Sequence, residues 1–467
     1  MEGGLGRAAV AACRYLVRSN EKVEVLFRSR PDLRRGPKKG TGEGISHLIR
    51  HSLTSTTPRT TKHSRFRNAR IFWGVHTPQE SSVASAVEAA DARQRRWLIV
   101  AGQIAFLPTG MLTTLLWPML PILSARWGLT YEQSGNLFPI QFLAQLAGVQ
   151  LSGVMLARFG FRPAFLSGLL LMAGGVGTLY LGSPWLGRAS VAVYGLGLGL
   201  IIPTDNLMIA EVSTGSRAAA VSLLNFFWGL GAVLCSLLVA WAQAHQLLPV
   251  LLESVALFLV LMAVAVRNLS FPAARKSTDP PVRWREIAHN PATWLFVCVF
   301  FLYPGTETAV GGWIGSYATK MGSHGASVGA MMPALFLAAL TAGRGAGGAL
   351  LHYVSERQVL RIGYGIGAAG IGLLLWIPSL PGVIASALIT GLNFATLYPI
   401  TVARLSQRFG VEARSVGSIM FSIAAIGPAA LPWLVGVISQ SAGNLRAGLA
   451  VPFIATVILF LIHLKEW

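Results

Sequence analysis

The chain has 467 residues, of which 53% are hydrophobic and only 12% are charged. Soluble domains carry about 25% charged residues, so this composition excludes a string of soluble domains, whose surfaces it could not cover. Three cysteines (Cys13, Cys235 and Cys298) are too few for a disulfide framework and lack metal-ligand spacing. The net charge of +20 is distributed unevenly along the chain.

Residues 1–96 are basic and polar. They hold 19 of the 38 Lys and Arg residues and contain no apolar run long enough for a membrane span or a secretory signal. This composition predicts a disordered cytoplasmic tail. Three alternatives stay open. Because no Met occurs between Met1 and Met111, residues 1–90 could precede the natural start of translation; the segment could also be a transit peptide or a nucleic-acid-binding arm.

Twelve apolar stretches follow, each near the roughly 20 residues that a transmembrane helix needs. They cover residues 97–123, 133–157, 163–182, 189–212, 217–242, 247–266, 293–318, 326–351, 358–378, 383–405, 414–438 and 446–464. We therefore predict an all-α membrane protein in which an N-terminal six-helix bundle (97–266) and a C-terminal one (293–467) are joined by a cytoplasmic linker (267–292).

Basic residues predict the orientation of these helices. If the N-terminus is inside, the inner loops hold 17 Lys and Arg residues and the outer loops hold four, namely Arg126, Arg188, Lys320 and Arg446. The positive-inside rule favours this orientation. We expect an integral protein of the plasma membrane, or of a bacterial inner membrane, with both termini in the cytoplasm.

The two predicted bundles repeat one another in sequence. Residues 146–163 align with 341–358 without a gap, so that Gly148 meets Gly343 and Arg162 meets Arg357. Parallel repeats of this kind imply two pseudo-symmetric bundles that face a shared cavity near the bilayer midplane.

The loop after the second predicted helix carries a recognisable pattern. Its residues Gly153, Arg158, Gly160 and Arg162 resemble an inner-loop motif of the major facilitator superfamily, in which an Asp stands where this chain has Ala157. The resemblance covers about 97–464 and implies the fold predicted above, transport by alternating access and a role for the motif in an inner gate, to which we add Arg344. Residues 224–232 and 307–317 also resemble the sodium-dependent glucose transporter-like and fucose:proton symporter branches.

Two acidic residues lie within predicted spans, where a charged side chain costs at least about 2.5–3.5 kcal/mol and is a functional candidate by default. Glu307 is near the middle of the seventh span, and Asp205 is toward the cytoplasmic side of the fourth. We predict that they couple transport to protons or sodium, Glu307 being the stronger candidate. The alternative is a structural role in holding helices together.

Polar and aromatic residues in the spans could bind a neutral solute, since amides pair with hydroxyl groups and aromatic faces cover C–H surface. The predicted solute-binding residues are Thr114, Trp117, Gln141, Gln145, Asn225, Trp228, Trp313, Asn393 and Tyr398. The alternative is that they form interhelical hydrogen bonds and fill space.

No sequence pattern indicates an enzyme. The chain has no phosphate-binding Gly-x-x-x-x-Gly-Lys-Ser/Thr run, no metal-ligand cluster and no paired nucleophile and base, so we expect neither catalysis nor a cofactor. The favoured function is secondary active transport of a small polar solute, with a sugar as the leading class. The alternatives are efflux of drugs or metabolites and a non-transporting membrane receptor. The expected partners are the solute and the lipid bilayer, with no nucleic acid, and the protein is expected to be a monomer.

Overall fold

A computed structural model of the chain describes residues 78–213, 217–272, 289–321, 325–409 and 413–464. Most of the predicted tail and most of the predicted linker therefore lie outside the described residues. Residues 77–467 form one structural unit. The described residues are helical, with short turns between helices and no strand among them, which confirms the predicted all-α class.

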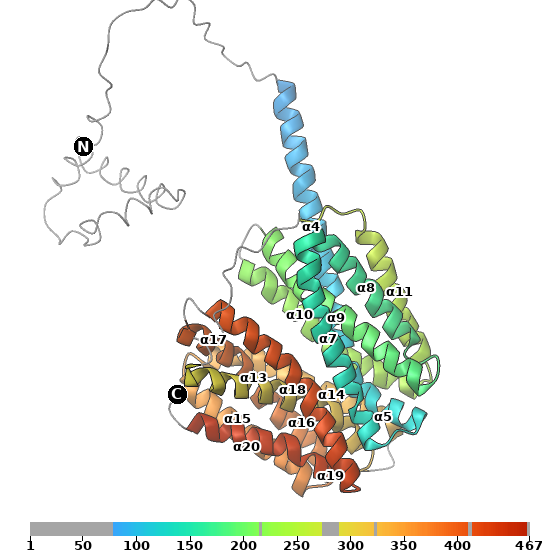
Figure 1. Cartoon of the computed structure of the whole chain (residues 1–467), viewed down its shortest axis with the longest axis vertical. Coiled ribbons are helices and arrows are strands. Elements are labelled where there is room, and N and C mark those ends of the chain that lie inside the picture. Colours follow the sequence, from blue (N-terminus) through green and yellow to red (C-terminus); the bar gives the residue numbers. More distant parts are fainter. Residues whose placement is uncertain (1–77, 214–216, 273–288, 322–324, 410–412, 465–467) are drawn as a thin grey trace, which may run out of the picture. The chain divides into compact units, whose positions relative to one another are not determined.

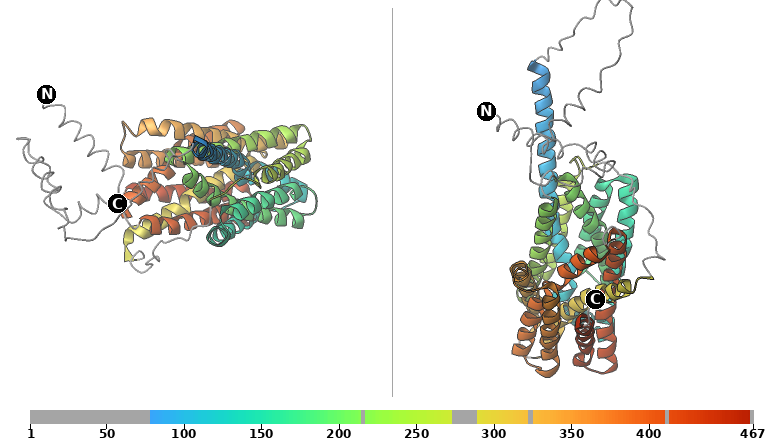
Figure 2. Two further views of the ribbon diagram at one scale, coloured as in Figure 1. Left: turned by 90° about the horizontal axis from the view of Figure 1, so that it is seen from above. Right: turned by 90° about the vertical axis from the view of Figure 1, so that its left-hand side faces the viewer.

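Each of the first six predicted spans corresponds to one helix or to a pair of consecutive helices. In chain order these are α4 (Pro78–Thr114) with α5 (Leu116–Trp127), α6 (Tyr131–Gly135) with α7 (Leu137–Phe159), α8 (Phe161–Thr178), α9 (Pro184–Val212), α10 (Arg217–Ala244) and α11 (Leu248–Val266). These helices, coloured blue to light green, are grouped together in Figures 1 and 2, and we call them the N-terminal bundle.

The last six predicted spans form the second group. They are α13 (Pro291–Ala318), α14 (Gly325–Leu350), α15 (Glu356–Trp376), α16 (Leu380–Phe394) with α17 (Leu397–Phe409), α18 (Ala413–Ser441), and α19 (Leu445–Gly448) with α20 (Ala450–Leu464). They are yellow to red in Figure 1 and form the C-terminal bundle. Among the described residues, ten helical segments are long and apolar enough to cross a membrane, and a shorter apolar segment covers Val328–Arg344.

The first helix begins earlier than the sequence predicted. Its backbone is helical from Pro78, whereas the predicted span starts at Trp97, and its N-terminal part extends beyond the neighbouring helices (Figure 1). Residues 78–94 are rich in Ala, Glu and Gln, which have high helix propensity. Extending a helix that already exists avoids the cost of nucleation, so a polar segment can continue an apolar span.

Four predicted spans are interrupted near a proline, and two of these breaks matter below. Pro118 has no N–H to donate to the carbonyl of Thr114, and the helix is broken at Leu115 between α4 and α5. In the same way Pro399 cannot donate to the carbonyl of Ala395, and α16 ends at Phe394 while α17 begins at Leu397. The second break lies beside the candidate site described below.

Glycines let helices within each bundle approach closely. A Cβ atom on Gly199 of α9 would collide with the backbone of Gln145 and lie 2.7 Å from the Cα atom of Gly148 on α7. Likewise Gly231 of α10 packs against the backbone of Leu107 on α4. Such contacts are typical of helix packing in membranes. There the hydrophobic effect does not drive helices together, and small residues allow the close van der Waals packing that does.

Several side-chain and glycine contacts between the two bundles lie toward one end. We call it the closed end; it carries the α5–α6 turn at Gly128, the C-terminus of α13 and the C-terminus of α18. There a Cβ atom on Gly135 would lie 3.2 Å from the Cα atom of Gly436. The opposite end carries the α7–α8 turn at Gly160 and the break between α16 and α17.

Candidate functional site

Tyr131 is the central residue of the closed end. Its backbone N–H donates to the Gln440 side chain over 3.2 Å, which joins α6 to α18. Its ring lies 6.4 Å from the Trp313 ring, and the Lys320 ammonium lies 4.3 Å from the centre of the Tyr131 ring. Cation–π contacts of this kind contribute about 0.5–1 kcal/mol at exposed sites. Three elements of the C-terminal bundle are thus held to one residue of the N-terminal bundle.

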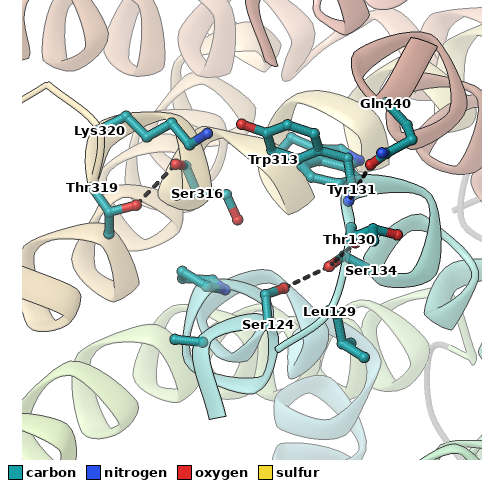
Figure 3. A pocket seen from close by; sticks show the side chains of 12 residues that line it. Ser124, Leu129, Thr130, Tyr131, Ser134, Trp313, Ser316, Thr319, Lys320 and Gln440 are labelled. Carbon is teal, nitrogen blue, oxygen red and sulfur yellow. Dashed lines mark hydrogen bonds between the residues drawn. The ribbon is translucent and has the colours of Figure 1, made fainter. Parts of the chain in front are cut away.

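A pocket of about 400 Å³ lies at this end between the bundles (Figure 3). Its lining includes hydroxyl groups of both bundles, with Ser124 and Ser134 hydrogen-bonded to each other over 2.7 Å. Lys320 is the charged residue in its lining. The pocket therefore presents polar groups on both sides of the boundary between the bundles.

Deeper in the protein, two aromatic side chains of the N-terminal bundle fit against glycines of α13. Trp117 of α5 occupies the space that a side chain at Gly311 would need, and Phe138 of α7 does the same at Gly312. Both aromatic residues are buried, and the Trp117 ring also lies 6.0 Å from the ring of Phe336 on α14. We call Trp117 and Phe138 the aromatic seal. They lie between the closed-end pocket and the part of α13 that carries Glu307.

Glu307 lies one helical turn below the aromatic seal. Residues four apart share a face of a helix, so Glu307 points to the same side as Gly311, which is the side that meets the N-terminal bundle. Its side chain is half-buried, and its Oε2 atom is 2.8 Å from the hydroxyl oxygen of Tyr303. A carboxyl group in mid-span is therefore placed toward the boundary between the bundles.

Aromatic residues surround this carboxyl group. Tyr303 is buried and stacks on Tyr398 of α17 with ring centres 5.8 Å apart, and its ring lies 5.6 Å from that of Phe394. The Glu307 carboxylate and the Arg344 guanidinium are both near enough for their charges to act on the Tyr303 and Tyr398 hydroxyls. Arg344, which the sequence assigned to a gate, is exposed and belongs to this charged region.

Asp205 has a different environment. It is fully buried in α9 against Gly102 of α4, and neither carboxylate oxygen has a hydrogen-bond partner in the described structure. An ionised carboxylate without a partner would be very costly in such a place, which favours the neutral form. The structure thus separates the two acidic candidates: Glu307 is at the bundle boundary and Asp205 is inside the N-terminal bundle.

Several predicted solute-binding residues instead connect helices of the N-terminal bundle. The Gln141 amide donates to the Thr113 carbonyl over 3.0 Å and accepts from the Tyr194 hydroxyl over 3.0 Å. The Trp228 indole N–H donates to the Thr113 hydroxyl over 3.3 Å. The Thr114 hydroxyl lies 3.2 Å from the Gly110 carbonyl oxygen of its own helix and 3.5 Å from the Ala232 carbonyl oxygen of α10. These contacts match the structural alternative for Gln141 and Thr114.

The remaining predicted solute-binding residues fall into two groups. Trp313 is buried and donates to the Pro432 carbonyl over 2.9 Å, so it belongs to the closed end. Gln145 has a buried amide oxygen with no partner in the described structure, while the amides of Asn225 and Asn393 donate only to carbonyls of their own helices. These three amides keep acceptor oxygens that a solute could use.

The loop motif lies at the opposite end. Gly153, Arg158 and Arg162 are exposed, and Gly160 turns the chain between α7 and α8 with a φ of 80°, a value that favours glycine. No described contact joins these residues to the C-terminal bundle.

Sequence reasoning missed Tyr131, Lys320, Tyr194 and Tyr303. Tyr303 stands four residues before Glu307, so helical spacing alone could have indicated it. The other three depend on packing between helices distant in sequence.

We expect that Gln141→Leu lowers stability, because it leaves the Tyr194 hydroxyl and the Thr113 carbonyl without their buried partner. Each unsatisfied group costs about 1–3 kcal/mol. Thermal unfolding of the purified protein in detergent measures the loss. Tyr194→Phe is the matched control: it removes one of the two bonds and should lower the unfolding temperature less. Equal stability of Gln141→Leu and the unchanged protein would contradict the structural role.

Comparisons with known proteins agree with this architecture. A family model described as Major Facilitator Superfamily matches residues 103–417. The chain is 24% identical over 355 residues to an uncharacterised MFS-type transporter of Yersinia pestis, covering 73% of this chain and 88% of that protein. It is 30% identical over 145 residues to the multidrug resistance protein MdtH of Shigella dysenteriae, covering 31% and 35%.

Solved structures show the same fold. A bacterial homologue of the human lysosomal transporter Spinster, inward-facing and unoccupied, superposes with a TM-score of 0.67 at 14% identity, over 79% of this chain and 96% of that one. A D-xylose-proton symporter gives 0.63 at 14% identity, over 79% and 96%.

Proposed function

Because the chain belongs to the Major Facilitator Superfamily, and is therefore an integral membrane transporter, we propose that it is a secondary active transporter that moves a small polar solute by alternating access. The observation that carries this proposal is the position of Glu307. It lies at the boundary of the two bundles, directly below a seal that shuts one end. A titratable group in that place can sense both solute and ion.

The conformation fits one half of an alternating-access cycle. The bundles are joined at the closed end, and the loop-motif arginines at the opposite end are exposed and make no described contact with the C-terminal bundle. The excess of basic residues in the loops of the opposite end favours a cytoplasmic location for it. We infer that the structure represents the inward-facing state, with the closed end toward the outside and both termini in the cytoplasm.

A neutral polar solute, with a sugar as the leading class, suits the amide oxygens in the described spans that have no partner. Gln145, Asn225 and Asn393 offer amide oxygens, and Tyr398 offers an aromatic face. Few charged side chains lie in the described spans, so a strongly ionic solute would lack partners. The structural likeness to a D-xylose-proton symporter is consistent with this class but is a likeness of fold.

A second candidate function is efflux of amphipathic compounds. The aromatic group formed by Phe300, Tyr303, Phe394 and Tyr398 could hold an apolar ring, and part of the chain is similar to a multidrug resistance protein. A compound of that type would leave the amide oxygens unused, whereas a sugar would engage them. This is why we place efflux second.

Reconstitution in proteoliposomes tests the proposal. Flux of labelled monosaccharides and of cationic dyes is measured with a proton gradient, with a sodium gradient and with neither. Gradient-driven accumulation of a monosaccharide supports solute uptake, and gradient-driven dye export supports the second candidate. Absence of flux for every compound in correctly inserted protein would contradict both.

Blocking closure of the sealed end should stop the cycle. A Cβ atom on Gly436 would lie 2.6 Å from the Tyr131 carbonyl oxygen, so Gly436→Trp should keep the bundles apart there. In a variant whose other cysteines are replaced, a Ser316→Cys thiol in the pocket lining should then react with a membrane-impermeant maleimide several-fold faster. Gly174→Trp is the control, since nothing lies within 4 Å of a side chain there. Unchanged labelling and flux in Gly436→Trp would contradict alternating access through this end.

A further inference from the structure

The hydroxyl group of Tyr303 lies within hydrogen-bond distance of two acceptors. Its oxygen is 2.8 Å from Oε2 of Glu307 and 2.7 Å from the backbone carbonyl oxygen of Phe394. Tyr303 is only 2% exposed, so water is excluded from its surroundings. The group thus connects a carboxyl on α13 with the last residue of α16.

A tyrosine hydroxyl has one proton to donate, and a backbone carbonyl has none. If Glu307 is ionised, its carboxylate and the Phe394 carbonyl compete for the single Tyr303 proton. Only one of the two hydrogen bonds can then form, and the oxygens of the other pair face each other with no proton between them. If Glu307 is protonated, it donates to Tyr303, which then donates to Phe394, and both bonds are made. Both acceptors are within reach of the single hydroxyl proton, so the presence or absence of a proton on Glu307 decides which acceptor receives it.

We propose that Tyr303 is a positioning residue for ion coupling: protonated Glu307 orients its hydroxyl toward Phe394, and loss of that proton redirects the hydroxyl to the carboxylate and frees the carbonyl. This inference rests on the proposed transport function and identifies the coupling ion as a proton.

The freed carbonyl matters because of where it is. Phe394 ends α16, and the final carbonyls of a helix lack partners within the helix. Tyr303 therefore caps α16 at the break in the tenth span, and its ring stacks on Tyr398, the second residue of α17. Losing the cap loosens the break and lets α17 change its angle, so a proton on one helix biases the conformation of another.

The proton balance is simple. A proton from water joins the Glu307 carboxylate to give the neutral acid, and the same proton returns to water when the acid ionises; Tyr303 keeps its own proton throughout and changes only its acceptor.

The charged and titratable neighbours among the described side chains are Tyr398 on α17, Tyr364 on α15 and Arg344 on α14. Helix α16 has no titratable side chain, and Arg126 of α5 is at the closed end against Tyr180. Arg344 is exposed, and its positive charge acts on the same Tyr303 hydroxyl as the Glu307 carboxyl.

The test measures how accessible the segment between α16 and α17 is, and it needs no solute. Thr396 lies between α16 and α17, so a Thr396→Cys thiol, with the other cysteines replaced, reports opening of this break through maleimide labelling across pH 5–9. Each labelling rate is divided by the rate for the same thiol in denatured protein at the same pH, because thiolate content itself rises with pH. We expect labelling to rise several-fold with increasing pH as Glu307 ionises. Glu307→Gln, whose amide can still donate to Tyr303, should hold labelling low at every pH. Tyr303→Phe should make labelling high and independent of pH.

Tyr364→Phe is the matched control. It removes another buried tyrosine hydroxyl whose ring lies 6.4 Å from that of Tyr303 but that takes no part in the two bonds, and it should keep the pH-dependent rise. A pH-dependent rise that persists in Tyr303→Phe would overturn the proposal, as would labelling that follows sodium concentration at fixed pH. If flux assays find no transport but labelling behaves as expected, the proposed function fails while the proton-dependent cap stands.

Discussion

Glu307→Gln is expected to lower gradient-driven accumulation at least tenfold while leaving solute exchange and downhill flux measurable. The substitution preserves shape and a hydrogen-bond donor to Tyr303 but removes titration, so the protein is held in the form that protonated Glu307 produces. Without release of a proton, the solute can still cross but cannot be driven against its gradient. Accumulation and counterflow in proteoliposomes measure the two processes separately.

Asp205→Asn provides the comparison. Asp205 is buried without a partner inside the N-terminal bundle, which favours its neutral form, so the amide replaces a group of the favoured charge. We expect accumulation to fall less than in Glu307→Gln. Unchanged accumulation in Glu307→Gln together with a large loss in Asp205→Asn would move the coupling role to Asp205.

Gly199→Val is expected to prevent folding of the N-terminal bundle. A side chain at this position would collide with the backbone of Gln145 and the Cα atom of Gly148, neither of which can move without separating α7 from α9. Overpacking of a well-packed core costs about 1–3 kcal/mol, and a clash with backbone places this case at or above the upper end. Loss of the monodisperse peak in size-exclusion chromatography in detergent measures the effect.

Gly174→Val separates this steric effect from lost backbone flexibility. Gly174 is also within a helix of the N-terminal bundle, but nothing lies within 4 Å of a Cβ atom there. It should fold and elute like the unchanged protein. Equal behaviour of the two variants would show that the close approach at Gly199 is not required.

The twelve spans and the all-α class could be read from the sequence because length and hydropathy are local properties of each helix. The breaks at Leu115 and between Phe394 and Leu397 could not be located in the same way, since a proline within a span predicts a disturbance but not its resolution into two helices. The helical start at Pro78 was missed for a related reason, because hydropathy marks where a span is apolar and not where its helix ends.

The candidate site was predictable in part. Glu307 could be selected because a carboxyl group in the middle of an apolar span is rare and costly. The roles of Gln141 and Trp117 could not be selected, since an amide that binds a solute and one that ties two helices together have the same spacing in sequence. Only the partners distinguish them: Tyr194 and Thr113 for Gln141, and Gly311 for Trp117.

The aromatic seal also sets the energetic scale of the transport cycle. Each large aromatic side chain buries about 150–250 Å², so withdrawing Trp117 and Phe138 from their glycine recesses would expose surface worth several kcal/mol at about 25 cal/mol per Å². A solute held with micromolar affinity contributes about 8 kcal/mol in total, and only the part that differs between the two conformations can shift their populations. In the proposed cycle, opening the sealed end would need compensating contacts at the opposite end, where Arg158 and Arg162 are exposed. The closed end is held largely by hydrophobic contact, whereas the arginines of the opposite end could close that end through charge. Temperature should therefore affect opening of the closed end, and ionic strength should affect closure of the opposite end.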